Sequence, residues 1–198
     1  MEIFPLLGFI ELKTLLLVGH LFGVALGAGV AFFSAVMFTK VMFDKRVTEN
    51  EMQFLELASA LVAFGLTLLV VTGLGMFLLD QEHYLASSKF LVKMTVVGIL
   101  IVNGTLIHTL HIPVLKKNLG KNLHSIPGFN TRSYFMYAGG AISMTSWATA
   151  LILGVFRGIP YPYETIFFTY LGALAVAILV SLLLHALTFG KNRLEIVE

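Results

Sequence analysis

The stretch Thr14–Thr39, TLLLVGHLFGVALGAGVAFFSAVMFT, contains no Asp, Glu, Lys or Arg, and it decides the fold. A helix needs about 20 mainly apolar residues to cross the hydrocarbon core of a bilayer, so this stretch is long enough to span one. Four further apolar stretches of similar length follow it, at about Leu57–Leu79, Phe90–Leu115, Tyr134–Phe156 and Thr165–Phe189. The sequence therefore predicts an all-α integral membrane bundle of five transmembrane helices, in a single domain over residues 1–198.

The composition excludes several other classes of protein. Hydrophobic residues make up 58% of the chain and charged residues only 12%. A soluble fold of this size cannot bury so much apolar surface. The 13 basic and 11 acidic residues leave a net charge of +2, which is too small for a nucleic-acid binder. The absence of cysteine excludes disulfides, thiolate metal sites and covalent c-type heme.

Lysine and arginine are distributed unevenly between the two sides of the predicted bundle. One side carries Lys40, Lys45, Arg46, Lys116, Lys117, Lys121, Arg132, Lys191 and Arg193, and the other carries Lys13, Lys89 and Arg157. Short cytoplasmic loops accumulate these residues, so we expect the N-terminus outside and the C-terminus in the cytoplasm. We expect a bacterial inner membrane as the location. The first stretch is too long for a cleaved signal peptide and is expected to remain in the mature protein.

Ionisable side chains at membrane depth are costly and are candidates for a functional site. His20 and Lys93 are expected in a layer near the outer side, and His108, His111 and His185 in a layer near the cytoplasmic side. At 100° per residue, Lys93, His108 and His111 would face within about 60° of one another. Two alternatives stay open: such histidines can simply hydrogen-bond a neighbouring helix, and Lys93 can extend toward the headgroups.

Small residues follow His20 on the same helix face. Gly23 and Gly27 lie three and seven positions after it, which would leave a slot for a flat ring. The alternative is close packing of two helices through the spacing of Gly19, Gly23 and Gly27.

A b-type heme is the cofactor that fits these residues best, because it needs one or two axial nitrogens and an apolar slot. No zinc motif and no dense cluster of His and Met are present. We expect one or two hemes. An outer heme would use His20 as iron ligand, with Lys93 on a propionate and Met76 as a second axial ligand. An inner heme would use His108 or His111 together with His185.

Two segments support this expectation by resemblance. The segments LLLVGHLFGVALGAGVAFF (15–33) and KFLVKMTVVGILIVNGTLIH (89–108) resemble small polytopic heme-associated membrane proteins. This group includes the bacterial membrane-type protoporphyrinogen oxidase and the copper-resistance D-like proteins. The resemblance implies heme binding at His20 and porphyrin chemistry near Lys93. The chain departs from that oxidase where Val92 precedes the lysine in place of a histidine, and at Val102 and Asn103 in place of an aromatic–histidine pair.

The sequence thus predicts a b-type heme protein that transfers electrons across the membrane. Two alternatives stay open. One is a porphyrinogen or quinol oxidoreductase with a single heme, and the other is a small transporter or membrane scaffold without a cofactor. Whether the protein is an enzyme is left open, as is its oligomeric state. Membrane lipid is an expected partner, with a quinone or another redox protein, and nucleic acid is not.

Overall fold

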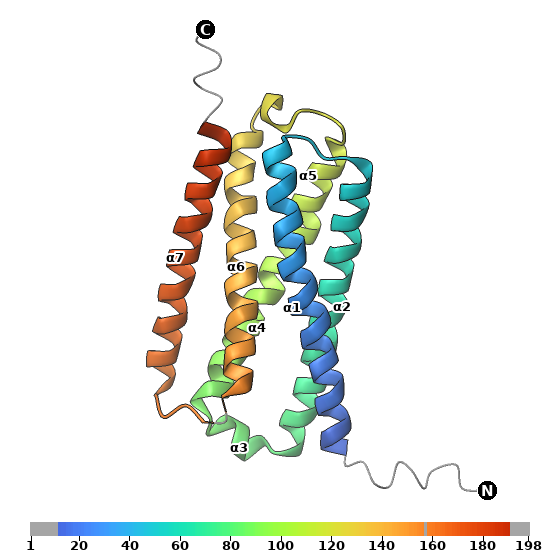
Figure 1. Cartoon of the computed structure of the whole chain (residues 1–198). Coiled ribbons are helices and arrows are strands. Elements are labelled where there is room, and N and C mark those ends of the chain that lie inside the picture. Colours follow the sequence, from blue (N-terminus) through green and yellow to red (C-terminus); the bar gives the residue numbers. More distant parts are fainter. Residues whose placement is uncertain (1–11, 157, 191–198) are drawn as a thin grey trace, which may run out of the picture.

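The computed structural model describes residues 12–156 and 158–190. In this part of the chain the structure is helical and contains no strand. The long helices are α1 (Leu12–Asp44), α2 (Glu49–Leu79), α4 (Ser88–Leu106), α6 (Phe129–Val155) and α7 (Tyr163–Gly190) (Figure 1). The shorter elements are α3 (Gln81–Leu85), a π-helical turn η2 (Ile107–His111), α5 (Ile112–Lys117) and a 3₁₀ turn η3 (Leu123–Ser125).

The prediction of an all-α bundle with five membrane-spanning helices is confirmed. Five helical spans are long and apolar enough to cross a membrane, and the third of them, Ser88–Lys117, is built from α4, η2 and α5 in succession. The helices are longer than the uncharged stretches of the sequence. For example, α1 continues through Lys40 to Asp44, and α2 begins at Glu49. At the start of α2, Thr48 and Glu51 form a capping box: the Thr48 hydroxyl accepts from Glu51 N, and the Glu51 carboxylate accepts from Thr48 N.

The two ends of the bundle differ in charge. The end formed by the C-terminus of α1, the N-terminus of α2, α5 and the N-terminus of α6 is called the basic end below, and the opposite end is called the α3 end (Figure 1). Lys40, Lys45, Arg46, Lys116, Lys117, Lys121 and Arg132 belong to the basic end. Acidic residues pair with some of them, since Lys40 binds Glu51 and Asp44, and Lys116 binds Glu56 at 2.7 Å.

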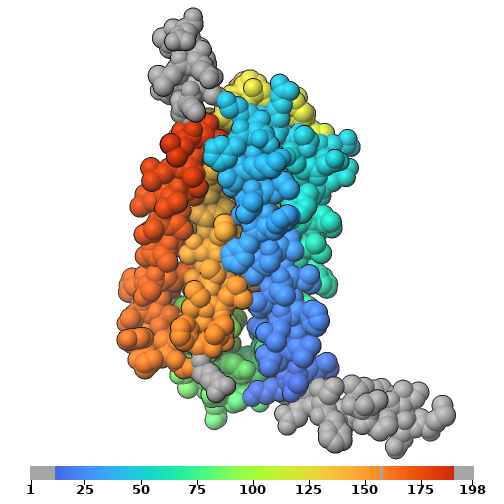
Figure 2. All heavy atoms as spheres, in the orientation of Figure 1, coloured from blue at the N-terminus to red at the C-terminus, as the bar shows by residue number. Residues whose placement is uncertain are grey.

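Helix contacts explain where space remains inside the bundle. Helices α1 and α2 are in close contact, α6 contacts α1, α4 and α7, and α2 meets α4 at few positions. Figure 2 shows α7 at the edge of the bundle, with its side chains on the outer surface. Its exposed residues include Phe168, Leu179 and Leu183, as expected for a helix that faces lipid. The bundle is therefore tight along α1 and α2 and looser between α2 and α4.

Candidate functional site

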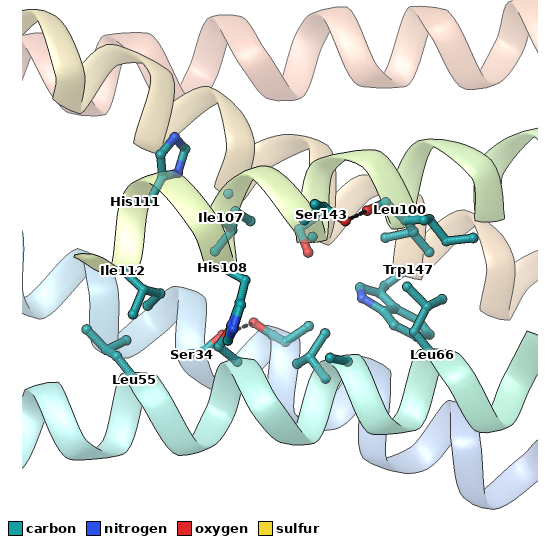
Figure 3. A pocket seen from close by; sticks show the side chains of 18 of the residues that line it. Ser34, Leu55, Leu66, Leu100, Ile107, His108, His111, Ile112, Ser143 and Trp147 are labelled. Atoms are coloured by element: carbon teal, nitrogen blue, oxygen red, sulfur yellow. Dashed lines mark hydrogen bonds between the residues drawn. The ribbon is translucent and has the colours of Figure 1, made fainter. Parts of the chain in front are cut away.

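A cavity of ≈ 490 Å³ lies between α1, α2, the α4–α5 span and α6 (Figure 3). Most of its lining is apolar. Its polar lining residues are Ser34, Ser59, Thr67, Thr105, His108, Thr109, His111, Ser143 and Trp147. Pockets of this size, apolar with a few polar groups, commonly hold cofactors or small ligands.

The cavity opens sideways between α2 and α4. Of the residues that line it, Ala63, Thr67 and Val71 on α2 are exposed, and so are Ile101 and Thr105 on α4. These positions lie in the middle of helices that are apolar enough to span a membrane. An apolar molecule dissolved in the lipid could therefore reach the cavity without passing through water.

The π-helical turn separates His108 from His111. The His108 ring points toward α2, where its Nδ1 lies 2.9 Å from Ser59 Oγ, whereas the His111 ring points toward α6, next to Gly139 (Figure 3). Lys93 also lies beside α6, with its Nζ 4.0 Å from the position of a Cβ on Gly154. The expectation that all three side chains share one sector is therefore wrong for His108. A π turn holds more residues than an α turn, so residues three apart no longer stack on one face.

Two glycines form open parts of the cavity wall. Gly104 on α4 and Gly140 on α6 line the cavity, and a Cβ at either position would meet no atom within 4 Å. The wall is thus flat and recessed at both places, which suits a flat ring. The same test gives the opposite result for the predicted slot beside His20. A Cβ on Gly23 would lie 2.8 Å from Gly65 O, and one on Gly27 would overlap the Trp147 ring.

The glycine face of α1 is therefore filled by protein. Helix α2 packs against Gly23, and the indole of Trp147 packs against Gly27. Of the two interpretations of this spacing, close helix packing is the one that the structure supports. Sequence spacing alone could not decide between them, because it gives the face of the helix and not what covers that face.

His20 on α1 and Lys93 on α4 both lie toward the α3 end of the bundle. His20 Nδ1 lies 3.1 Å from Thr72 Oγ1, and the Thr72 hydroxyl donates its proton to Leu68 O at 2.6 Å. Thr72 Oγ1 therefore accepts from His20 Nδ1, which leaves the lone pair of the neutral imidazole on Nε2. Lys93 is half-buried and interacts electrostatically with His20. Met76 is half-buried one turn after Thr72 on α2.

His185 lies in a different environment, between α6 and α7. Its Nε2 donates to Ser133 Oγ at 2.7 Å, because the Ser133 hydroxyl itself donates to Asn130 O. Tyr134 and Phe189 lie against the ring, with centroids 3.8 and 4.5 Å away. Its Nδ1 is buried without a partner among the described residues. The structure does not bring His185 to His108 or His111, so it does not support the predicted pair of axial ligands.

The structure places Ser143 and Trp147 in the cavity wall, although neither residue was predicted from the sequence. Met136, Gly140, Ser143 and Trp147 occupy one face of α6 and line the cavity together. The Trp147 side chain is 1% exposed, and its Nε1 has no hydrogen-bond partner in the described part of the chain. The i, i+3 and i+7 spacing of Gly140, Ser143 and Trp147 was the available signal.

These features define a polytopic α-helical membrane protein with a laterally open, mainly apolar cavity. No family model, curated protein or solved structure matches the chain. Within residues 12–156 and 158–190, no group of three or more His, Asp or Glu side chains is placed to hold a metal ion. A heme does not need such a group, because its porphyrin supplies four of the iron ligands.

Proposed function

We propose that the protein binds one b-type heme in this cavity and transfers electrons in the membrane. The single observation that carries the proposal is the cavity itself, with His108 inside it and the recessed glycines 104 and 140 in its walls. Together they offer a nitrogen ligand and flat space between four helices. A heme bound there would supply one-electron chemistry.

His108 has the environment expected of an iron ligand. Metal-binding histidines usually hydrogen-bond through the ring nitrogen that does not bind the metal, and this bond fixes the orientation of the ring. The contact between His108 Nδ1 and Ser59 Oγ supplies such a bond. Nε2 would then bind iron while Nδ1 donates to the serine. A neutral imidazole brings no net charge into the hydrocarbon, which favours histidine over lysine as the ligand.

His111 is the second histidine of the cavity and the alternative ligand. It lies on the α6 side of the same π turn, close to Gly139. His20 is proposed as a residue outside the heme site, since protein fills the glycine face next to it. Its electrostatic interaction with Lys93 and its bond to Thr72 give it a local role at the α3 end.

The proposal includes the orientation and the location of the protein. The basic end faces the cytoplasm, because short cytoplasmic loops accumulate Lys and Arg. The membrane is the bacterial inner membrane, and the partners are lipid and a redox protein or a quinone. A second candidate function, a quinol or porphyrinogen oxidoreductase with one heme, is favoured by the lateral opening between α2 and α4.

The absorption spectrum of the purified protein tests the proposal. Protein expressed with a heme supply should show a Soret band close to one heme per chain, and heme-free protein should take up added hemin at the same ratio. His108→Ala should lose most of this absorbance. His83→Ala should keep it, since His83 is exposed on α3. Heme-free protein that binds no added hemin would overturn the proposal and favour a transporter or scaffold.

A further inference from the structure

We propose that the end of the cavity at Trp147 binds the headgroup of a lipid-soluble para-quinone. The inference goes beyond the proposed heme site, because it rests on different residues and needs no iron. Trp147 and Ser143 on α6 would donate to the two carbonyl oxygens. The hydrocarbon tail would leave through the opening between α2 and α4.

Trp147 carries an unsatisfied hydrogen-bond donor in the wall of the cavity. Trp147 Nε1 is buried and donates to no acceptor in residues 12–156 and 158–190. In Figure 3 the indole nitrogen is on the side of the ring that faces along the cavity toward His108. An unpaired buried N–H costs free energy, and buried tryptophans usually donate to a partner. A ligand that carries an acceptor would remove this cost.

A second free donor lies one turn away on the same helix. Ser143 also lines the cavity, and its hydroxyl makes no hydrogen bond within the described residues. Residues four apart in a helix face the same side, about 6 Å apart along the axis. This separation is comparable to that of the two oxygens across a para-quinone ring. The two donors therefore match a ligand with two opposed carbonyl groups.

The hydroxyl groups of the cavity threonines already donate hydrogen bonds to backbone carbonyls of their own helices. Thr67 donates to Ala63 O, Thr105 to Ile101 O and Thr109 to Thr105 O, at 2.7 to 2.8 Å. Ser34 likewise donates to Ala31 O at 3.0 Å. Among the described hydroxyl and indole groups of the cavity, the donors still free for a ligand are thus those of Ser143 and Trp147 on α6, together with the Ser59 hydroxyl on α2 when His108 Nδ1 donates to it.

The depth of Trp147 in the membrane indicates which class of ligand can reach it. Its ring packs on Gly27, which lies 15 residues after Leu12 and 17 before Asp44 (27 − 12 and 44 − 27). At 1.5 Å per residue, Gly27 is about 22 to 26 Å from either end of α1, near the middle of the membrane. Ester carbonyls of phospholipids lie at the interface, about 15 Å from the midplane. A quinone carries its carbonyls within the hydrocarbon and reaches this depth.

The cavity also has the length for such a molecule. Its lining on α2 runs from Leu55 to Val71, a difference of 16 residues and about 24 Å. Ser59, which contacts His108, and Leu66, which packs beside Trp147, are seven residues apart, or about 10 Å. His108 and Trp147 thus lie toward different ends of the cavity, and a heme that reaches Gly140 would share the space beside Ser143 with the quinone headgroup.

Trp147 is the only tryptophan of the chain, so intrinsic fluorescence reports on this site directly. The experiment is a titration of detergent-purified, heme-free protein with decylubiquinone. We expect saturable quenching at one quinone per chain. Decylbenzene, which lacks carbonyls, and a short-chain phospholipid should give no saturable change. N-acetyltryptophanamide in the same micelles measures the non-specific quenching to be subtracted.

Two variants separate hydrogen bonding from general apolar binding. Ser143→Ala should weaken quinone binding about tenfold, the effect of one lost hydrogen bond. Ser34→Ala is the matched control: this serine lines the same cavity, but its hydroxyl is already bonded, so the affinity should not change. Trp147→Phe removes the fluorophore, and its binding is followed with radiolabelled quinone. It should also bind about tenfold more weakly.

The outcomes distinguish this inference from the heme proposal. Quinone binding should persist in heme-free protein and in His108→Ala, even if no heme ever binds. Three results would overturn the quinone site: quenching that does not saturate, equal quenching by decylbenzene, or unchanged affinity in both Ser143→Ala and Trp147→Phe. Circular dichroism and gel filtration establish that each variant is folded. A quinone that binds while hemin does not would reject the heme proposal alone.

Discussion

The indole of Trp147 on α6 packs directly onto Gly27 of α1, so closely that a methyl group at position 27 would overlap the ring. This contact joins α1 and α6 in the middle of the bundle, within a buried cluster that includes Ala28, Leu69 and Leu100. It also fixes the position of the ring in the wall of the cavity. Helix packing and the ligand site thus depend on the same glycine.

Gly27→Ala should therefore destabilise the bundle. The added methyl must displace the Trp147 ring or separate α1 from α6, and such overpacking typically costs about 1–3 kcal/mol. The measurement is the thermal unfolding temperature in detergent. Gly29→Ala is the matched control, since a Cβ there would meet nothing within 4 Å. Equal stability of the Gly27→Ala variant and the wild-type protein would contradict this account of the packing.

Gly104→Leu should block heme uptake without unfolding the protein. Position 104 has open space and lines the cavity, so a leucine there would occupy the volume needed by the ring. Gly98→Leu on the same helix is the control, because position 98 also has open space but does not line the cavity. The readout is hemin bound per chain. Similar hemin binding by both variants would show that the cavity is not the heme site.

His124, at the basic end, should make stability depend on pH. Burial and the nearby positive charge of Lys45 lower the pKa of His124 below its usual 6.5. As the pH falls through 6.5, the unfolded chain takes up a proton before the folded one, so stability is lost from that point down to the lower folded pKa. The unfolding temperature should thus fall between pH 7 and pH 5.

Replacing His124 by Phe should make that pH dependence smaller. The ring of His124 stacks on Phe189 with centroids 4.0 Å apart, so phenylalanine keeps the stacking and removes the titration. His83→Phe on the exposed α3 controls for the change of residue type. An identical slope of unfolding temperature against pH in the wild type and His124→Phe would reject a role for His124.

The orientation of the bundle can be tested because the chain has no cysteine. A cysteine at Asn122, in the loop before η3 at the basic end, should be labelled by an impermeant thiol reagent only after the cells are opened. A cysteine at the exposed Gln81, at the start of α3, should be labelled from outside intact cells. The reverse pattern of labelling would invert the proposed topology.

The sequence predicted the helices well because each membrane span needs only local information, its length and apolarity. The shared layer of His20 and Lys93 stays a prediction, because it was inferred only from their positions along the two helices. The sequence did not predict which neighbouring helix packs against Gly23, Gly27 or His185. Gly23 and Gly27 are covered by α2 and Trp147, and His185 is enclosed by Tyr134 and Phe189, through contacts between distant segments.

The cavity could not be predicted from the sequence either, because it too depends on contacts between distant segments. It exists because α2 and α4 separate while α1 and α6 hold the other sides, and no single stretch encodes that arrangement. The π turn at Ile107–His111 also changed the angle between His108 and His111, which a uniform 100° per residue could not anticipate.

Rescue of His108→Gly by free imidazole tests the central claim most directly. If His108 binds the iron, the glycine variant should take up hemin weakly and with an altered Soret band. Added imidazole should occupy the vacated space and restore the wild-type spectrum. The same treatment should not alter the spectrum of His20→Gly, which should bind hemin as the wild type does. A His108→Gly variant with wild-type heme content and spectrum before any imidazole is added would contradict the account.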